Sequence, residues 1–421
     1  MEFTINHKDS EKTQIIPESL ELLEWPIVCK HLSTFAVTQQ GRNRCKSFNL
    51  PLDISLSKEL LSQTLEIGSL DISLDGGISF EGVHDLENIL LICSKGGVAI
   101  GEDLLKVADT LRTGRKLRKL IFDQLIRPRL SELLKDVVTL PDLQKLLEFG
   151  LDEGGRIADR ASPKLSELRR HRNLVRLQRK DILQDIIRKY GGLLQDNIIS
   201  ERYGRPVLAF KAGTSDKIKG MVHDSSASGN TIYVEPQVVI SIGNRLAKID
   251  SEISNEERRL LAYWSKEVGF NSDAIAHLGE TLLQIEFALS RARYSKWLDG
   301  VPATLDEQGN SLFEIKDFRH PLLVWNDFHK KKNTVVPTSF DVPAELKVVA
   351  ITGPNTGGKT VALKSIGLAV LMAKAGILLP CTGSPRLPWC KNVLADIGDE
   401  QSLQQNLSTF SGHILRISRI L

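Results

Sequence analysis

Cysteine is scarce and scattered in this sequence of 421 residues. The five cysteines form neither a CxxC pair nor a metal-ligand spacing with histidine, so they predict reduced thiols. The first residues have no apolar core and mix acids with bases, which argues against a secretory signal or a transit peptide. The most apolar segment, residues 366–380, is interrupted by Lys374 and is too short for a bilayer span of about 20 residues. We therefore expect a cytoplasmic protein without a membrane partner.

A strong excess of charge of either sign is also missing. The formal net charge is +3, which permits a polyanionic partner without requiring one. Hydrophobic residues at 41% and charged residues at 25% are typical of a soluble globular protein and argue against a disordered or fibrous chain. The length predicts roughly two to four domains.

The spacing of apolar and turn residues indicates a multidomain protein that combines α and α/β parts. Within its first helical part, the turn-rich residues 76–86 either order a junction between helices or form a simple surface loop. The predicted order is an N-terminal tail (1–18), a helical domain (19–155), an antiparallel helical arm (156–265), a return to the helical domain (266–310) and an α/β domain (311–421).

The arm is predicted from two apolar stripes. Ser162 and Pro163 form a typical helix start, and the helix can run to Tyr190 before two glycines. Two such stripes imply an antiparallel pair of helices, roughly 40 Å long at 1.5 Å per residue, with a small β tip near residues 205–236. Glu256 interrupts the second stripe. The stripes are Leu165, Leu168, Val175, Ile182 and Ile186, then Val239, Ile242, Leu246, Ile249, Ile253 and Leu260.

The first helix of the arm is rich in bases. Arg169, Arg170 and Arg176 are the candidates for contacts with nucleic acid. The alternative is an ordinary solvated helix face. Binding that weakens with salt would distinguish a surface that faces phosphates.

A phosphate-binding loop is the most specific motif. Its residues fit G-x-x-x-x-G-K-[ST], between a predicted strand at 346–352 and a predicted helix at 361–376. Glycines let backbone N–H groups surround phosphates, Lys359 neutralises them, and the Thr360 hydroxyl binds Mg²⁺, so ATP and Mg²⁺ are the expected cofactors. The loop residues are Gly353, Pro354, Asn355, Thr356, Gly357, Gly358, Lys359 and Thr360.

Hydrolysis of ATP also requires carboxylates after a second strand. The only acids after the loop are Asp396, Asp399 and Glu400, and they follow the short run "VLA" rather than a full buried strand. The sequence therefore assigns no catalytic residue and predicts nucleotide binding without predicting hydrolysis.

Several motifs together resemble MutS proteins, which are ATPases of the ABC type. They are "GPNTGGKT", "ADIGDEQSLQQNLSTFSGH" and "HPLL". The stretch "GMVHDSSASGNTIYVEP" resembles, more narrowly, the second bacterial MutS lineage, the endonuclease MutS paralogues that lack the mismatch-reading domain. The resemblance implies a helical core and lever domain split by a coiled-coil clamp arm, followed by a partial ABC-type ATPase domain with a P-loop. It also implies a homodimer in which Ser408, Thr409 and Phe410 reach the partner's nucleotide.

Members of that lineage continue through an acidic motif and a histidine loop to a small nuclease domain called Smr. This sequence stops at Leu421, so the resemblance predicts a C-terminally truncated member, and the family's nuclease activity is not transferred to it.

The function that the resemblance implies is an ATP-binding clamp on structured or mismatched DNA that suppresses homologous recombination. Two alternatives stay open: a factor that binds ribosomal RNA, senses collided ribosomes and splits them, and a degenerate remnant that does not hydrolyse ATP. An SMC-like protein is disfavoured because there the nucleotide loop precedes the coiled coil, whereas here it follows.

Overall fold

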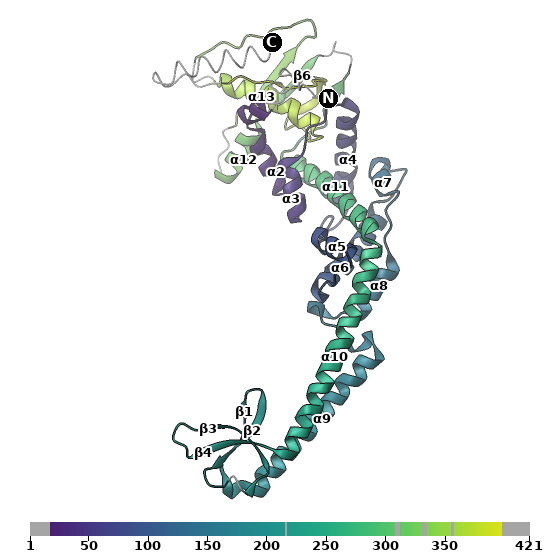
Figure 1. Ribbon diagram of the computed structural model, residues 1–421. Helices are drawn as coiled ribbons and strands as arrows, with labels where there is room; N and C mark the ends of the chain where they lie inside the picture. The colour runs from purple at the N-terminus through teal and green to yellow at the C-terminus, as the bar shows by residue number, and fades with distance from the viewer. Residues whose placement is uncertain (1–16, 215–216, 308–311, 331–334, 355–357, 398–421) are drawn as a thin grey trace, which may run out of the picture. The chain divides into compact units, whose positions relative to one another are not determined.

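The structure is a computed structural model that describes residues 17–214, 217–307, 312–330, 335–354 and 358–397 (Figure 1). The chain divides into two compact units. The core unit takes its described residues from Met1–Asp85, Asp109–Thr139 and Asp273–Leu421, and the arm unit consists of those of Leu86–Ala108 and Leu140–Ser272.

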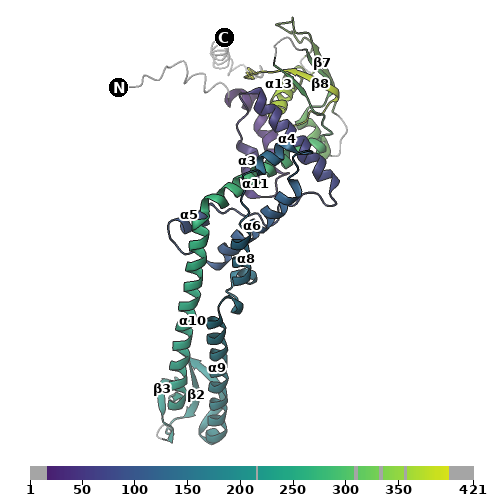
Figure 2. The same ribbon diagram turned by 90° about the vertical axis from the view of Figure 1, so that its right-hand side faces the viewer.

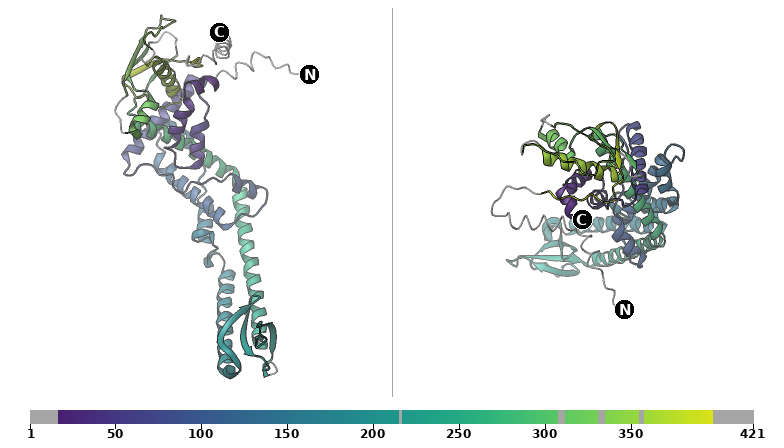
Figure 3. Two further views of the ribbon diagram at one scale, coloured as in Figure 1. Left: turned by 90° about the vertical axis from the view of Figure 1, so that its left-hand side faces the viewer. Right: turned by 90° about the horizontal axis from the view of Figure 1, so that it is seen from above.

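The core unit is built mainly from helices that come from both ends of the chain. Figure 3 shows the purple N-terminal helices against the yellow-green C-terminal segment. One apolar cluster joins them, with Val28, Tyr294 and Leu368 all fully buried. The helices are α2 (Trp25–Ser33), α3 (Gln39–Ser47), α4 (Ile54–Ser73), the second half of α6 (Gly101–Ile121), α7 (Pro128–Leu134), α11 (Ser272–Trp297), α12 (Pro321–Lys330) and α13 (Lys359–Lys374).

A small sheet completes the core unit. Its strand order is β5-β8-β6-β7, in which β5 and β8 are parallel and the other pairs are antiparallel. The strands are β5 (Thr304–Asp306), β6 (Phe313–Phe318), β7 (Thr338–Val342) and β8 (Thr382–Pro388).

The arm unit is dominated by two long helices. They are accompanied by α5 (Glu87–Ser94), α8 (Pro141–Gly150) and the short 3₁₀ turns Glu153–Gly155 and Asp159–Ala161. Helix α9 (Pro163–Tyr190) starts where the sequence predicted, because the Ser162 hydroxyl accepts a hydrogen bond from the N–H of Leu165, and a 3₁₀ turn at Gly191–Leu193 follows it. Helix α10 (Gln237–Phe270) buries all six predicted apolar positions. In α9, by contrast, Leu165 and Val175 are buried, whereas Leu168, Ile182 and Ile186 are half-buried.

Polar contacts set the register between α9 and α10, which lie side by side (Figure 2). The guanidinium of Arg172 lies 3.6 Å from the Asp250 carboxylate, and that of Arg169 lies 2.7 Å from Glu257. Partners that come earlier in α9 therefore meet residues that come later in α10, so the two helices are antiparallel.

Four strands cap the far end of this helix pair (Figure 1). They are β1 (Leu194–Arg202), β2 (Arg205–Lys211), β3 (Gly220–Ser225) and β4 (Thr231–Pro236), in the antiparallel order β1-β2-β4-β3. The two apolar runs that predicted strands lie in β2 and β4 and pair directly, Leu208 opposite Val234. Strand β1 was not predicted, and it extends the sheet beyond the expected 205–236. Its side chains are mostly polar and exposed, so its sequence gave little β signal.

The cysteines agree with the prediction of reduced thiols. All five are free, and burial raises the pKa of Cys29 to about 12 and that of Cys45 to about 11, so neither is a reactive thiolate. Among the described residues, no helix is long and apolar enough to cross a membrane.

Glu256 of α10 is bonded to the N-terminal end of α9. Its side chain is only 3% exposed, and its carboxylate accepts hydrogen bonds from Ser162 Oγ at 2.9 Å and from Arg259 Nη2 at 2.7 Å. Lys164 Nζ lies 3.5 Å away. The Arg259 hydrogen bond, assisted by Ser162 and Lys164, outweighs burial and lowers the pKa of Glu256 to about 2. The residue that interrupts the apolar stripe is thus a polar anchor.

We predict that Glu256→Gln destabilises the protein by roughly 1 to 3 kcal/mol at neutral pH, because the buried Ser162 hydroxyl and the Arg259 guanidinium lose a charged acceptor. Since the folded-state pKa lies below the unfolded value, the stabilisation by Glu256 is present above about pH 4.5 and is lost as the pH falls toward about 2. Urea unfolding at several pH values measures this difference. Glu252→Gln, one turn earlier and without a polar partner in the described chain, is the matched control. An equal loss in both variants, or a loss that does not shrink in acid, would contradict the assignment.

Candidate nucleotide-binding site

The phosphate loop leads directly into helix α13. Gly358 precedes the helix with φ 77°, in the left-handed region that favours glycine, and its carbonyl accepts the first helical hydrogen bond, from Ala362 N–H at 2.9 Å. Lys359 is the first residue of the helix, and its Nζ donates to the Gly353 carbonyl at 2.8 Å. The two ends of the loop are therefore joined. Asn355, Thr356 and Gly357 lie outside the described residues.

This geometry fits an anionic ligand. The first N–H groups of a helix have no partner within the helix and carry the positive end of its dipole. Lys359 adds a full charge there, and Thr360, the second helical residue, is exposed. A hydroxyl at that place can bind Mg²⁺ together with the phosphates, which is how magnesium is usually held. In the part of the chain that the structure describes, no group of three His, Cys, Asp or Glu side chains forms a metal site by itself.

The strand predicted before the loop is not formed. Residues 346–352 pair with no strand in the described chain, and Val348 and Val349 are 83% and 54% exposed. A strand needs neighbours that satisfy its N–H and C=O groups, and none of the four strands of the core sheet adjoins this segment. The prediction of a strand at residues 346–352 was therefore wrong for the described structure.

A second feature adjoins the loop, and we call it the histidine pocket. It has a volume of about 370 Å³ and lies next to Thr360. His31 from α2 stacks on Trp325 of α12, with ring centroids 4.0 Å apart and an interplanar angle of 11°. Lys364 of α13 forms an ion pair with Glu24 at 3.0 Å. The pocket is lined by Glu24, Ile27, His31, His320, Leu322, Leu323, Asn326, Thr360, Val361 and Lys364.

Both histidines of the pocket are neutral at physiological pH. His320 is 6% exposed, and burial, with a smaller effect of Lys364, lowers its pKa to about 4. Burial, helped by His329 and Lys30, lowers the pKa of His31 to about 4 as well. The Nδ1 atoms of both rings have no hydrogen-bond partner within the described residues. Neutral rings with free nitrogens suit a flat, uncharged group better than a phosphate.

Of the remaining predicted residues of the site, the structure describes only Asp396. Asp396 is half-buried, and the residues directly before it form no strand. Asp399, Glu400, Ser408, Thr409 and Phe410 lie outside the described residues.

The arginines of the arm fall into two kinds. Arg169 donates to Asp159 at 2.6 Å, to Glu257 at 2.7 Å and to the Ile157 carbonyl at 2.9 Å, so its charge is compensated within the chain. Arg170 and Arg176 are exposed and have no polar partner in the part of the chain that is described. Arg170 and Arg176 therefore remain the candidates for phosphate contacts, and Arg169 does not.

Comparisons with known proteins agree with the motifs. A family model described as MutS domain V matches residues 349–421. An endonuclease MutS2 of Synechocystis sp. is 42% identical over 414 residues, which make up 98% of this chain and 50% of the relative. This chain belongs to the MutS family. The endonuclease MutS2 of Pelotomaculum thermopropionicum is 36% identical over 96% of this chain and 50% of its own length, and that of Halalkalibacterium halodurans is 34% identical over 96% and 51%.

Within the MutS family the chain is of the MutS2 type, as the arm motif predicted. It spans about half the length of the curated relatives it matches. Sequence reasoning found the loop but missed His31, which lies far from the loop in the chain and carries no motif. The "HPLL" motif did single out His320, without indicating that its ring would be buried beside Thr360.

The buried and neutral His320 predicts a specific dependence of stability on pH. Because the folded-state pKa of His320 is lowered below its ordinary value of 6.5, the unfolded chain binds more protons, and stability falls as the pH drops from about 6.5 toward about 4. His320→Gln should make that fall smaller. Urea unfolding at pH 7.5 and pH 5 measures it, with the exposed His277→Gln as the control. An unchanged fall in the His320 variant would show that the ring is not buried and neutral.

Proposed function

We propose that this chain is an ATP-binding nucleic-acid clamp of the MutS family, which acts on structured or mismatched DNA and suppresses homologous recombination. The observation that carries the proposal is the start of α13, where Lys359 and Thr360 follow a left-handed glycine and Lys359 reaches back to Gly353. The family of the chain supports the nucleotide and the nucleic acid as ligands.

In this function the chain's own groups hold the phosphates. Backbone N–H groups of the loop and of the first turn of α13 donate to phosphate oxygens, and Lys359 exchanges its bond to the Gly353 carbonyl for a phosphate. Thr360 would hold Mg²⁺, which neutralises phosphate charge when bound. These statements concern binding, and none of them depends on hydrolysis.

The antiparallel helices α9 and α10 form the clamp arm. Two such arms would enclose DNA in a homodimer, in which Ser408, Thr409 and Phe410 would reach the partner's nucleotide. The exposed Arg170 and Arg176 supply charge that no ion pair with a described residue cancels. The five free cysteines support a reducing compartment, and we place the protein in the cytoplasm.

We predict that Lys359→Ala weakens the binding of Mg·ATP by roughly 100-fold, about 3 kcal/mol, because a phosphate charge loses its cation. Isothermal titration with ATP and with inorganic triphosphate measures the loss, and both ligands should be affected. The exposed Lys330→Ala, at the end of α12, controls for the loss of a lysine. Full affinity of the Lys359 variant for ATP would remove the loop from the site.

We also predict that replacing Arg170 and Arg176 together by Gln weakens binding to junction DNA and reduces the salt slope by roughly two, about 0.9 for each lost phosphate contact. The control pairs Arg169→Gln with Arg172→Gln, two arginines of the same helix whose charges are compensated by acids. This control should lower thermal stability and leave the salt slope nearly unchanged.

An equal salt slope in the Arg170 and Arg176 variant would return both residues to an ordinary solvated face. If the unsubstituted chain bound collided ribosomes more tightly than junction DNA at the same salt concentration, ribosomal RNA would replace DNA as the partner.

A further inference from the structure

The second half of α6 carries an unbalanced run of positive charge in the core unit. Residues 110–121 contain five bases and no acid. At helical spacing, residues three, four and seven apart lie on one face. Arg112, Arg115, Lys116 and Lys119 therefore form one row, and we call Arg115, Lys116 and Lys119 the basic stripe.

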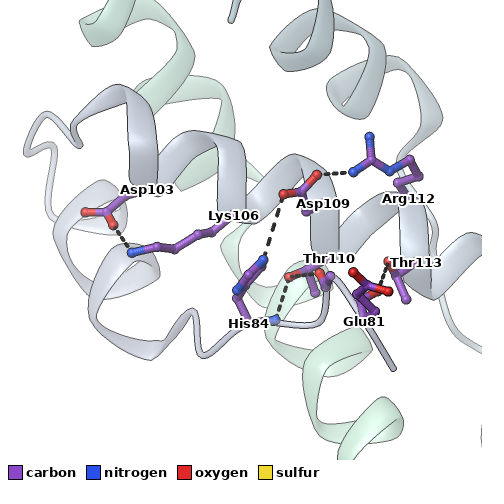
Figure 4. A network of polar contacts seen from close by, with 9 residues as sticks. Glu81, His84, Asp103, Lys106, Asp109, Thr110, Arg112 and Thr113 are labelled. Atoms are coloured by element: carbon purple, nitrogen blue, oxygen red, sulfur yellow. Dashed lines mark hydrogen bonds and ion pairs between the residues drawn. The ribbon is translucent and has the colours of Figure 1, made fainter. Parts of the chain in front are cut away.

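The neighbours of these bases differ sharply. Arg112 forms an ion pair with Asp109, whose other oxygen lies 3.8 Å from His84 Nε2 (Figure 4). Arg118 donates to the Leu134 carbonyl at 3.4 Å and lies over the Phe122 ring. The three residues of the basic stripe, in contrast, have no polar partner among the described residues. Lys116 and Lys119 are exposed, and Arg115 is half-buried.

The stability of the helix does not account for this arrangement. Bases in the last turn interact favourably with the helix dipole, but only Arg118 and Lys119 lie there, and the effect falls off within one turn. Like charges three or four positions apart cost about 0.2 to 0.5 kcal/mol for each pair. Arg115 and Lys116 therefore bring repulsion that no acid in the described part of the chain compensates, which suits a surface that meets an external polyanion.

A groove with hydrogen-bonded walls lies beside the basic stripe. A groove of about 790 Å³ runs along α6, and Lys116 is part of its lining together with His84 and Arg112. The loop of residues 76–86 forms the other wall. Hydrogen bonds join this loop to α6: Thr113 Oγ1 donates to the Glu81 carbonyl at 3.0 Å, and Thr110 Oγ1 accepts from His84 N–H at 3.1 Å (Figure 4). These bonds attach the loop to α6.

We propose that the basic stripe is a second nucleic-acid contact that binds the phosphate backbone of duplex DNA, separate from the arm. The rise from Arg115 to Lys119 is about 6 Å. One strand of duplex DNA carries a phosphate about every 3.4 Å along its axis, so the basic stripe spans about two phosphate intervals and reaches three successive phosphates. This inference rests on the proposed function, because it assumes that the chain binds DNA.

The test replaces Arg115, Lys116 and Lys119 together by Gln in the full chain. DNA binding is measured by fluorescence anisotropy with a labelled duplex junction from 50 to 300 mM salt. Losing three phosphate contacts should reduce the salt slope by roughly 2.7 and weaken binding at least about tenfold at 100 mM salt. The control set is Lys30→Gln, Lys46→Gln and Lys58→Gln, three exposed lysines of the core unit. A variant that keeps the charges, Arg115→Lys with Lys116→Arg and Lys119→Arg, should bind as the unsubstituted chain does.

Each outcome decides between the claims. If the unsubstituted chain fails to bind the junction, the proposed function falls and this inference falls with it. If the unsubstituted chain binds and the basic-stripe variant binds equally, only the inference is overturned. An equal loss in the control set, or a loss in the charge-keeping variant, also overturns it. A larger loss on an RNA duplex than on DNA of the same length would overturn the assignment to DNA.

Discussion

The nucleotide helix α13 is fixed at its far end by side chains from other helices of the core unit. Ser57 and Thr64 of α4 donate to the carbonyls of Lys374 and Gly376, each at 2.8 Å, and the buried Arg291 of α11 donates to the Ala375 carbonyl at 3.3 Å. The last carbonyls of a helix lack partners within it, so Ser57 and Arg291 satisfy two of them, and Thr64 holds the backbone just past the end of the helix. Gly367 allows the helix to pack closely against Leu23, because a Cβ at this position would lie 2.6 Å from Leu23 Cδ2. The position of Lys359 therefore depends on residues throughout the core unit.

Charge in this protein is used in two ways that sequence alone does not separate. Arginines such as Arg169 hold α9 against α10 because a carboxylate of the facing helix meets each of them. Others on the same helix, and the basic stripe on α6, meet no acid in the described chain and remain available to a polyanion. Buried Glu256 shows the converse, since an acid inside an apolar seam is stable when Ser162, Lys164 and Arg259 surround it.

Local signals in the sequence predicted the local structure well. The Ser162 cap, the end of α9 at Tyr190 and the buried stripe of α10 each depend on a few neighbouring residues, and all three are confirmed. Contacts between distant segments were not predictable. The pairing of Arg169 with Glu257 requires the register of two helices, and the stacking of His31 on Trp325 requires knowing that α2 packs against α12. Strand β1 is polar and gave no pattern, and the apolar run before the phosphate loop suggested a strand whose neighbours are not in the described chain.

One measurement tests most directly whether a single chain carries both binding sites. It is an equilibrium titration of Mg·ATP into the chain, at low salt, with and without saturating junction DNA. If the loop binds ATP while the arm and the basic stripe hold DNA, saturable ATP binding will be seen in both samples, and the DNA will stay bound throughout. Any effect of DNA on the affinity for ATP must be matched by an equal effect of ATP on the affinity for DNA. No saturable ATP binding in either sample, or complete displacement of one ligand by the other, would contradict two separate sites.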